Sequence, residues 1–302
     1  MDKARGGNHP DLQRVECRQV NAATTRSAWT VRTLKAAGET VSAIVADTGH
    51  DPVVFLHGNS STKSVWVRQL AATRDCGRSV LAPDLPGHGE SEDAHLPDIT
   101  YSLPGYAAVV GALLDVLNWM SVDVVGWSLG GHIGLELLAT DNRVRSLLIV
   151  GTPPVPLQPD SLADAFHRSE IMDLTGKRDF TEAEALAYGS AMMGGSQLLS
   201  RELLESLKRT DGNARQLLFA SALSGMGANQ RTTAEKIEKP LCVVHGEHDP
   251  FVRLDYLRAL RYRALWRNRI YLIAGAGHAP HWQCPLSFNN ILLDFLGAAE
   301  TR

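Results

Sequence analysis

The stretch Val122–His132, VDVVGWSLGGH, decides the fold because it joins a buried strand to a helix through a sharp turn. Its apolar start predicts a strand, and the apolar residues that follow it predict a helix. The turn holds Ser128 between Gly126 and Gly130, the G-x-S-x-G pattern that presents a serine hydroxyl at a strand-to-helix bend. Glycine is expected at both flanking positions because side chains would collide where strand and helix cross so closely. Ser128 is therefore a candidate nucleophile.

A nucleophilic serine also needs donors that stabilise the oxyanion formed on the attacked carbonyl. The amide of Leu129 opens the predicted helix, where free N–H groups and the helix dipole favour negative charge. His57-Gly58-Asn59 follows the apolar run Val53–Leu56, at the end of the third predicted strand. We expect the backbone N–H groups of Leu129 and Asn59 to form the oxyanion hole. The side chain of Asn59 could also be offered to the substrate.

Two more polar residues follow predicted strands in the second half of the chain. Asp249 comes after Pro240–His245, and His278 comes after Arg269–Ile273. Loops at the carboxyl ends of parallel strands converge in space, so these side chains can meet Ser128. We expect His278 to act as the general base. Asp249 would accept its other N–H, fixing the tautomer and stabilising the imidazolium.

Other residues could take the same roles. Glu247 could replace Asp249 as the acid, although the Asp-Pro pair predicts a turn at the strand end. His88 and His281 are alternatives to His278, but each could simply hydrogen-bond within its own loop. The histidines near these positions match neither an HExxH nor an HxHxDH pattern. We therefore expect no metal and no cofactor.

The order of strand and helix patterns predicts an α/β fold with a mostly parallel, doubly wound sheet. The alternation holds over residues 28–154, the first part of the core, and returns over residues 238–302, the second part. Residues 155–237 have helical patterns and no strand-like run, which predicts a helical cap over the carboxyl ends of the strands. Residues 1–27 are polar and aperiodic, so we expect a flexible N-terminal tail. The helical patterns include Asp160–Thr175 in the cap and Leu254–Trp266 in the second part of the core.

Composition excludes several classes of function. The chain has 302 residues, of which 44% are hydrophobic and 21% charged, and a formal net charge of -3. This charge offers no electrostatic case for nucleic acid or an anionic membrane as a partner, and nothing points to a particular oligomeric state. No apolar stretch has the length or place of a signal peptide or a membrane span. Without a CxxC motif, we expect four reduced thiols in a cytoplasmic protein. The cysteines are Cys17, Cys76, Cys242 and Cys284.

Two sets of motifs resemble known families. The chain resembles the α/β-hydrolase superfamily over about residues 52 to 296, and the order nucleophile, acid, histidine is the one this superfamily uses. More narrowly, it resembles the metal-independent N-acyl-homoserine lactone lactonases of this fold, which are quorum-quenching enzymes. The broad resemblance rests on His57–Ser61, Ala82–Gly89, Gly126–His132 and Ala276–Pro280. The narrow one rests on Gly126–Gly134, Gly151–Val155, Asn229–Arg231 and Asp249–Val252.

The narrow resemblance implies a reaction and further site residues. It implies that Ser128 attacks a lactone carbonyl and that deacylation by water gives an N-acyl-homoserine. It also implies that Tyr188 in the cap, with Trp127 at the turn, contacts the substrate. Those lactonases can carry Glu as the acid, whereas this chain has Asp249, which keeps the charge and shortens the reach.

Three other interpretations use the same scaffold. A carboxylesterase or a carbon–carbon bond hydrolase would use the same three residues on another small-molecule substrate. A small-molecule receptor on this scaffold would bind without turnover. Epoxide hydrolases and haloalkane dehalogenases are disfavoured, because their nucleophile is a carboxylate and position 128 is serine.

Overall fold

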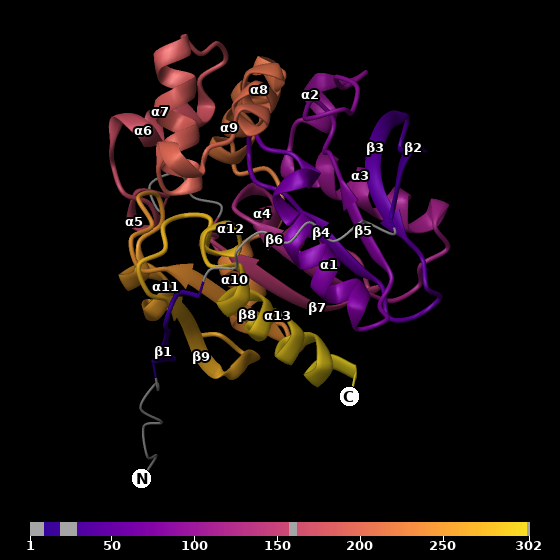
Figure 1. Cartoon of the computed structure of the whole chain (residues 1–302), viewed down its shortest axis with the longest axis vertical. Coiled ribbons are helices and arrows are strands. Elements are labelled where there is room, and N and C mark those ends of the chain that lie inside the picture. The colour runs from indigo at the N-terminus through magenta and orange to yellow at the C-terminus, as the bar shows by residue number, and fades with distance from the viewer. Residues whose placement is uncertain (1–8, 19–28, 157–161, 301–302) are drawn as a thin grey trace.

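A single nine-stranded sheet organises the protein (Figure 1). The computed structural model describes residues 9–18, 29–156 and 162–300. The strand order is β1-β9-β8-β7-β6-β4-β5-β3-β2, and β3 alone runs against its neighbours. The predicted α/β fold with a mostly parallel sheet is confirmed. The strands are β1 (Asp11–Val15), β2 (Thr30–Ala36), β3 (Glu39–Ala46), β4 (Val53–Leu56), β5 (Val80–Pro83), β6 (Val122–Trp127), β7 (Val144–Val150), β8 (Leu241–Gly246) and β9 (Leu265–Ile273).

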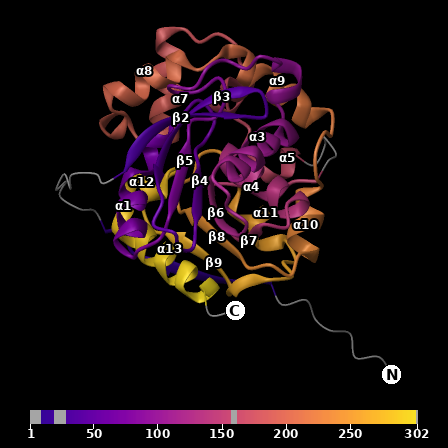
Figure 2. The same ribbon diagram turned by 90° about the vertical axis from the view of Figure 1, so that its right-hand side faces the viewer.

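Helices cover both faces of this sheet (Figure 2). The central strands β4, β6 and β8 are buried along their whole length, which explains their continuous apolar runs. One face carries α1 (Val67–Asp75), α12 (Pro280–Gln283) and α13 (Pro285–Glu300), with η1 (Lys63–Trp66) before α1. The other carries α3 (Leu103–Val116), α4 (Leu129–Thr140) and α10 (Gln230–Lys236).

A second group of helices lies above one end of the sheet (Figure 1). No strand of the sheet comes from this part of the chain, within the residues described. This group and the short α2 (Pro97–Thr100) stand on the side where β6 ends in Ser128. It comprises α5 (Leu162–Ala165), α6 (Glu170–Asp173), η3 (Leu174–Gly176), α7 (Glu182–Met193), η4 (Ser196–Leu198), α8 (Arg201–Arg209) and α9 (Gly212–Leu223).

Two predicted helices are shorter in the structure. The helix predicted over 160–175 is broken into α5 and α6, because Phe166 pairs with Val252 in a β-bridge between them. Positions 160 and 161 of that prediction lie outside the described residues. The helix predicted over 254–266 ends at Ala259, forming α11 (Leu254–Ala259). Its last residues belong instead to β9, which pairs with β8, so tertiary pairing overrides local helical spacing.

The N-terminal segment also differs from its prediction. Within the predicted tail, residues 1–27, Asp11–Val15 form the edge strand β1, which runs parallel to β9. An edge strand that is mostly exposed needs few apolar residues, and this is why its sequence looked aperiodic. Residues 1–8 and 19–27 lie outside the described part of the chain.

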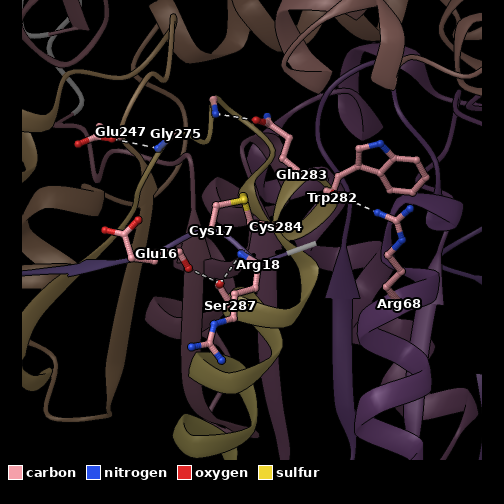
Figure 3. The surroundings of a disulfide bond; sticks show 11 residues. Glu16, Cys17, Arg18, Arg68, Glu247, Gly275, Trp282, Gln283, Cys284 and Ser287 are labelled. Carbon is pink, nitrogen blue, oxygen red and sulfur yellow. Dashed lines mark hydrogen bonds between the residues drawn. A yellow bond between two sulfur atoms is a disulfide. The ribbon is translucent and has the colours of Figure 1, made fainter. Parts of the chain in front are cut away.

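A disulfide joins this segment to the other end of the protein (Figure 3). Cys17 is bonded to Cys284, at the junction of α12 and α13, whereas Cys76 and Cys242 are free. The prediction of four reduced thiols is therefore wrong for one pair. The two partners are 267 residues apart, a separation that no spacing motif signals. Reduced cysteines were a reason to predict a cytoplasmic location, and the disulfide removes that reason.

Candidate active site

Ser128 lies in a strained turn between β6 and α4. Its φ of 51° and ψ of -115° place a residue with a side chain in a region that favours glycine, at a cost of about 1–3 kcal/mol. The turn is held in place by hydrogen bonds. The Ser128 N–H donates to the carbonyl of Val150 at 2.9 Å, and its own carbonyl accepts from Gly131 at 2.9 Å and His132 at 3.1 Å. These hydrogen bonds thus hold Ser128 in its strained conformation.

The flanking glycines are required by close approach, as predicted. A Cβ atom on Gly126 would lie 2.3 Å from the carbonyl oxygen of Gly130. A Cβ atom on Gly130 would lie 2.1 Å from the carbonyl oxygen of Leu56 in β4. Both obstacles are backbone atoms, which cannot rotate away.

Asp249 and His278 meet although they follow different strands. The His278 ring nitrogen Nδ1 lies 3.0 Å and 2.9 Å from the two carboxylate oxygens of Asp249. Asp249 follows β8, and His278 lies in the loop after β9. The Gly277 N–H donates to Gln283 Oε1 at 2.8 Å and holds this loop against α12.

The surroundings of Asp249 keep its carboxylate charged. Burial by itself would raise the pKa of this carboxyl, but the nearby His278, with its hydrogen bond, outweighs burial and lowers the pKa below its usual value. His245 acts in the same direction. The backbone N–H groups of Phe251 and Val252 donate to Oδ1 at 2.8 Å and 3.1 Å.

A mostly apolar cavity of about 130 Å³ joins these groups to the helices above the sheet. Ser128, His278, Asn59 and Leu129 all lie on its wall, so the structure brings these predicted residues together. The wall comprises Asn59, Leu103, Ser128, Leu129, His132, Val155, Phe166, Met172, Thr175, Tyr188, Met192, Arg215, Leu218, Phe219, Ala222, Phe251 and His278.

The two residues predicted for the oxyanion hole occupy different positions on this wall. Leu129 is the first residue of α4, so its N–H has no acceptor within the helix. Asn59 follows β4, and its side-chain amide donates to the carbonyl of Thr175 at 3.0 Å. Its Oδ1 accepts from the Ser60 hydroxyl at 3.4 Å. The Asn59 side chain is therefore used to join the sheet to the segment before α7.

Tyr188 and Trp127 have different surroundings. Tyr188 is on the cavity wall in α7; burial raises the pKa of its hydroxyl to about 12, and the hydroxyl interacts with Thr175 and Asn59. Trp127 is fully buried and is not on the wall. Its indole N–H donates to the carbonyl of His278 at 2.9 Å. Trp127 therefore supports the histidine loop, and its predicted contact with a substrate stays a prediction.

The alternative acid and bases are engaged elsewhere. Glu247 receives hydrogen bonds from Arg14 at 3.0 Å and 3.2 Å and from the Gly275 N–H at 2.9 Å. His88 is buried against the carbonyl of Pro86. His281 is fully buried and stacks on Trp66, with ring centroids 4.3 Å apart. Neither of these two histidines lies on the cavity wall, whereas His278 does.

Sequence reasoning missed three polar residues of the wall, of which the first, Thr175, lies in η3. His132 lies four residues after Ser128 in α4, and this helical spacing was the available signal. Arg215 comes from α9, and its guanidinium donates to the carbonyls of Lys177 at 2.8 Å and Arg178 at 2.5 Å. No local pattern marks Arg215, because its partners lie in another segment.

Comparisons with known proteins identify the family of the chain. A family model described as alpha/beta hydrolase fold matches residues 51–285. Among solved structures, the chain is similar to a mutant of the N-acyl homoserine lactonase AidH complexed with N-hexanoyl homoserine lactone. The two share 34% identity and a TM-score of 0.85, over 89% of this chain and 98% of the other.

Curated relatives are hydrolases of several kinds. A pimeloyl-[acyl-carrier protein] methyl ester esterase from Xanthomonas campestris is 30% identical over 77% of this chain and 90% of its own length. A 2-hydroxy-6-oxononadienedioate/2-hydroxy-6-oxononatrienedioate hydrolase from Paraburkholderia phymatum is 26% identical over 82% of this chain and 88% of its own length. The bifunctional biotin biosynthesis protein BioHC of Teredinibacter turnerae is 27% identical over 83% of this chain, which spans only 45% of that protein. Within the described residues, no helix is long and apolar enough to cross a membrane. With its serine turn, its parallel sheet and a family match over residues 51–285, the chain belongs to the α/β-hydrolase family.

Proposed function

We propose that this protein hydrolyses N-acyl-homoserine lactones, with Ser128 as nucleophile, His278 as general base and Asp249 as its partner. The observation that carries the proposal is that Ser128 and His278 lie on the wall of one apolar cavity, and that His278 is hydrogen-bonded from behind by Asp249. The 34% identity with a lactonase crystallised with an acyl lactone supports this substrate over others.

The reaction takes place in two steps. The Ser128 hydroxyl attacks the lactone carbonyl and passes its proton to His278, whose Nδ1–H is held by Asp249. The N–H groups of Leu129 and Asn59 stabilise the oxyanion. The ring C–O bond then breaks, and the departing alkoxide takes the proton from His278. A water molecule, deprotonated by His278, then attacks the ester on Ser128, and the bond to the serine oxygen breaks as His278 returns the proton to it, which releases the N-acyl-homoserine.

The cavity wall fits an acyl chain next to the reacting carbonyl. Phe166, Met172 and Leu218 are apolar and come from residues 162–223, whereas Ser128 comes from the sheet side. Burying methylene groups against such a wall contributes about 0.8 kcal/mol for each. The lactone would lie at Ser128 with its acyl chain between these two layers.

The test is ring opening by the purified protein, followed by proton release with N-acyl-homoserine lactones of several chain lengths. We expect turnover that Ser128→Ala abolishes and that EDTA leaves unchanged. Lactone turnover that persists in Ser128→Ala would contradict the proposed nucleophile, and inhibition by EDTA would contradict the metal-free mechanism.

A carboxylesterase, or a carbon–carbon bond hydrolase with the same residues, is the second candidate. The resemblance to a methyl ester esterase favours the former of these. If the protein hydrolyses linear methyl esters and has no activity on lactones, it is a carboxylesterase and the lactonase proposal fails.

A further inference from the structure

His132 places a second imidazole on the wall that holds Ser128. It lies in the first turns of α4, four residues after the serine. Ser128 precedes the helix and His132 lies in its first turn, yet both side chains reach the same cavity. The mechanism above gives His132 no part, so its presence on the wall needs another explanation.

The hydrogen bonds around His132 select one tautomer. Its Nδ1 lies 2.7 Å from Oε1 of Gln230, a buried residue at the start of α10. The amide of Gln230 is oriented because its Nε2 donates to the backbone carbonyl of His132 at 3.4 Å. Oε1 can only accept, so Nδ1 carries the proton and Nε2 presents a lone pair.

The ring stays neutral across the physiological pH range. Burial lowers the pKa of His132 to about 4, and the hydrogen bond with Gln230 only partly offsets this. Behind His278 lies the carboxylate of Asp249, whereas behind His132 there is a neutral amide. His132 is therefore suited to accept a hydrogen bond and not to take up a proton.

The other polar side chains of the wall, apart from Ser128 and His278, already interact with protein groups. Asn59 donates to the carbonyl of Thr175, and Tyr188 interacts with both of these residues. Arg215 donates to backbone carbonyls. In the part of the chain that the structure describes, Nε2 of His132 has no hydrogen bond to protein, although a polar group on a ligand-binding wall gains most when it is paired.

We propose that Nε2 of His132 accepts a hydrogen bond from an N–H group on the carbon next to the scissile carbonyl. The site would thereby select α-acylamino lactones and esters over their alkyl analogues. This inference rests on the proposed function, because it assumes that the reacting carbonyl lies at Ser128. Only one carbon atom separates such an N–H from the carbonyl carbon, so a substrate whose carbonyl lies at Ser128 keeps this N–H inside the cavity that His132 also lines.

The test compares substrates that carry the acylamino group with alkyl analogues that lack it, and the His132 variants show how far the difference depends on this acceptor. The lactone pair is N-hexanoyl-homoserine lactone and α-heptyl-γ-butyrolactone, and the linear pair is the methyl ester of N-hexanoylglycine and methyl nonanoate. The variants are His132→Phe, which keeps a ring without an acceptor, and His132→Gln, which keeps an acceptor. His95→Phe is the control, since His95 is exposed and absent from the cavity wall.

We expect His132→Phe to lower kcat/KM for the acylamino member of each pair by about 10- to 100-fold and for the alkyl member by less than about threefold. His132→Gln should recover part of the loss, and His95→Phe should change neither member. If kcat/KM fell equally for both members of a pair, the role of His132 would be structural. If kcat/KM changed for neither member, His132 would not contact the substrate. Either result would overturn the inference.

Binding separates this inference from the proposed reaction. In a Ser128→Ala background, calorimetry should show tighter binding of N-hexanoyl-homoserine lactone than of the alkyl lactone, and adding His132→Phe should remove the difference. If lactones bind selectively but are not hydrolysed, the lactonase proposal fails while the role of His132 stands. If lactones are hydrolysed and neither binding nor turnover depends on His132, the lactonase proposal stands and the role of His132 fails.

Discussion

Ser128 shows how one residue depends on the atoms around it. Its left-handed backbone conformation is maintained by Val150 on one side and by the first turn of α4 on the other. The chemistry expected of this serine requires that the turn stay sharp. The residues that control it are therefore the glycines, whose only contribution is the absence of a side chain.

Gly130→Ala tests this dependence. The added Cβ atom would lie 2.1 Å from the carbonyl oxygen of Leu56, so strand and helix must separate. We expect a loss of about 1–3 kcal/mol in the free energy of unfolding, measured with urea, and a large fall in activity. Gly297→Ala is the matched control, because Gly297 lies in α13 with nothing within 4 Å of its added Cβ. That variant should be slightly more stable than the parent, and equal effects of the two substitutions would refute the steric argument.

The lowered pKa of Asp249 predicts how stability depends on pH. A carboxyl whose folded-state pKa lies below its unfolded value stabilises the protein above the unfolded pKa, near 3.9, and this contribution is lost as pH falls through the folded pKa. Asp249→Asn cannot titrate. The difference in melting temperature between parent and variant should therefore shrink between about pH 5 and pH 3. A constant difference over this range would show that Asp249 is not stabilised as a carboxylate.

At the scale of elements, the helices above the sheet are joined to it by a few polar contacts. Arg215 in α9 donates to two carbonyls before α7, and its guanidinium lies 4.3 Å from the ring of Phe180. It also donates to the Ser60 hydroxyl at 3.3 Å, on the sheet side. Arg215 therefore holds together three segments that are far apart in the sequence.

Arg215→Met should loosen this junction. The carbonyls of Lys177 and Arg178 would lose buried donors, at a cost of about 1–3 kcal/mol in stability. We expect faster proteolytic cleavage within residues 162–223 and a higher KM. Arg201→Met is the control, since Arg201 is exposed at the start of α8. Cleavage at the parent rate in Arg215→Met would show that other contacts hold these helices.

At the scale of the whole molecule, a single covalent bond links the two ends of the chain. Cys17 follows β1, which lies beside β9, and Cys284 lies six residues beyond His278. The bond is flanked by hydrogen bonds through Ser287, which accepts from the Arg18 N–H and donates to the carbonyl of Glu16 (Figure 3). A loop closed over 267 residues restricts the unfolded chain strongly.

Removing this bond should lower stability more than activity. Cys17→Ser should reduce the free energy of unfolding by about 2–5 kcal/mol, and a reductant should do the same to the parent protein. The turnover number at a temperature where both proteins are folded should change little, because Asp249 and Trp127 hold His278 independently. Cys76→Ser, which replaces an exposed free cysteine, should have no effect. A parent protein that melts at the same temperature with and without reductant would exclude the bond.

The sequence by itself determined the serine turn, the motifs that follow the parallel strands and the meeting of Ser128, His278, Asn59 and Leu129 on one wall. These depend on local requirements: glycines at a close crossing, apolar runs in buried strands, and polar residues at strand ends. Only the tertiary structure decided that Trp127 supports the histidine loop, that Arg215 joins distant segments and that residues 11–17 are attached to the sheet. It also ended α11 at Ala259, because pairing with β8 outweighed helical spacing. In each of these cases the partner is distant in the sequence, and no local pattern specifies it.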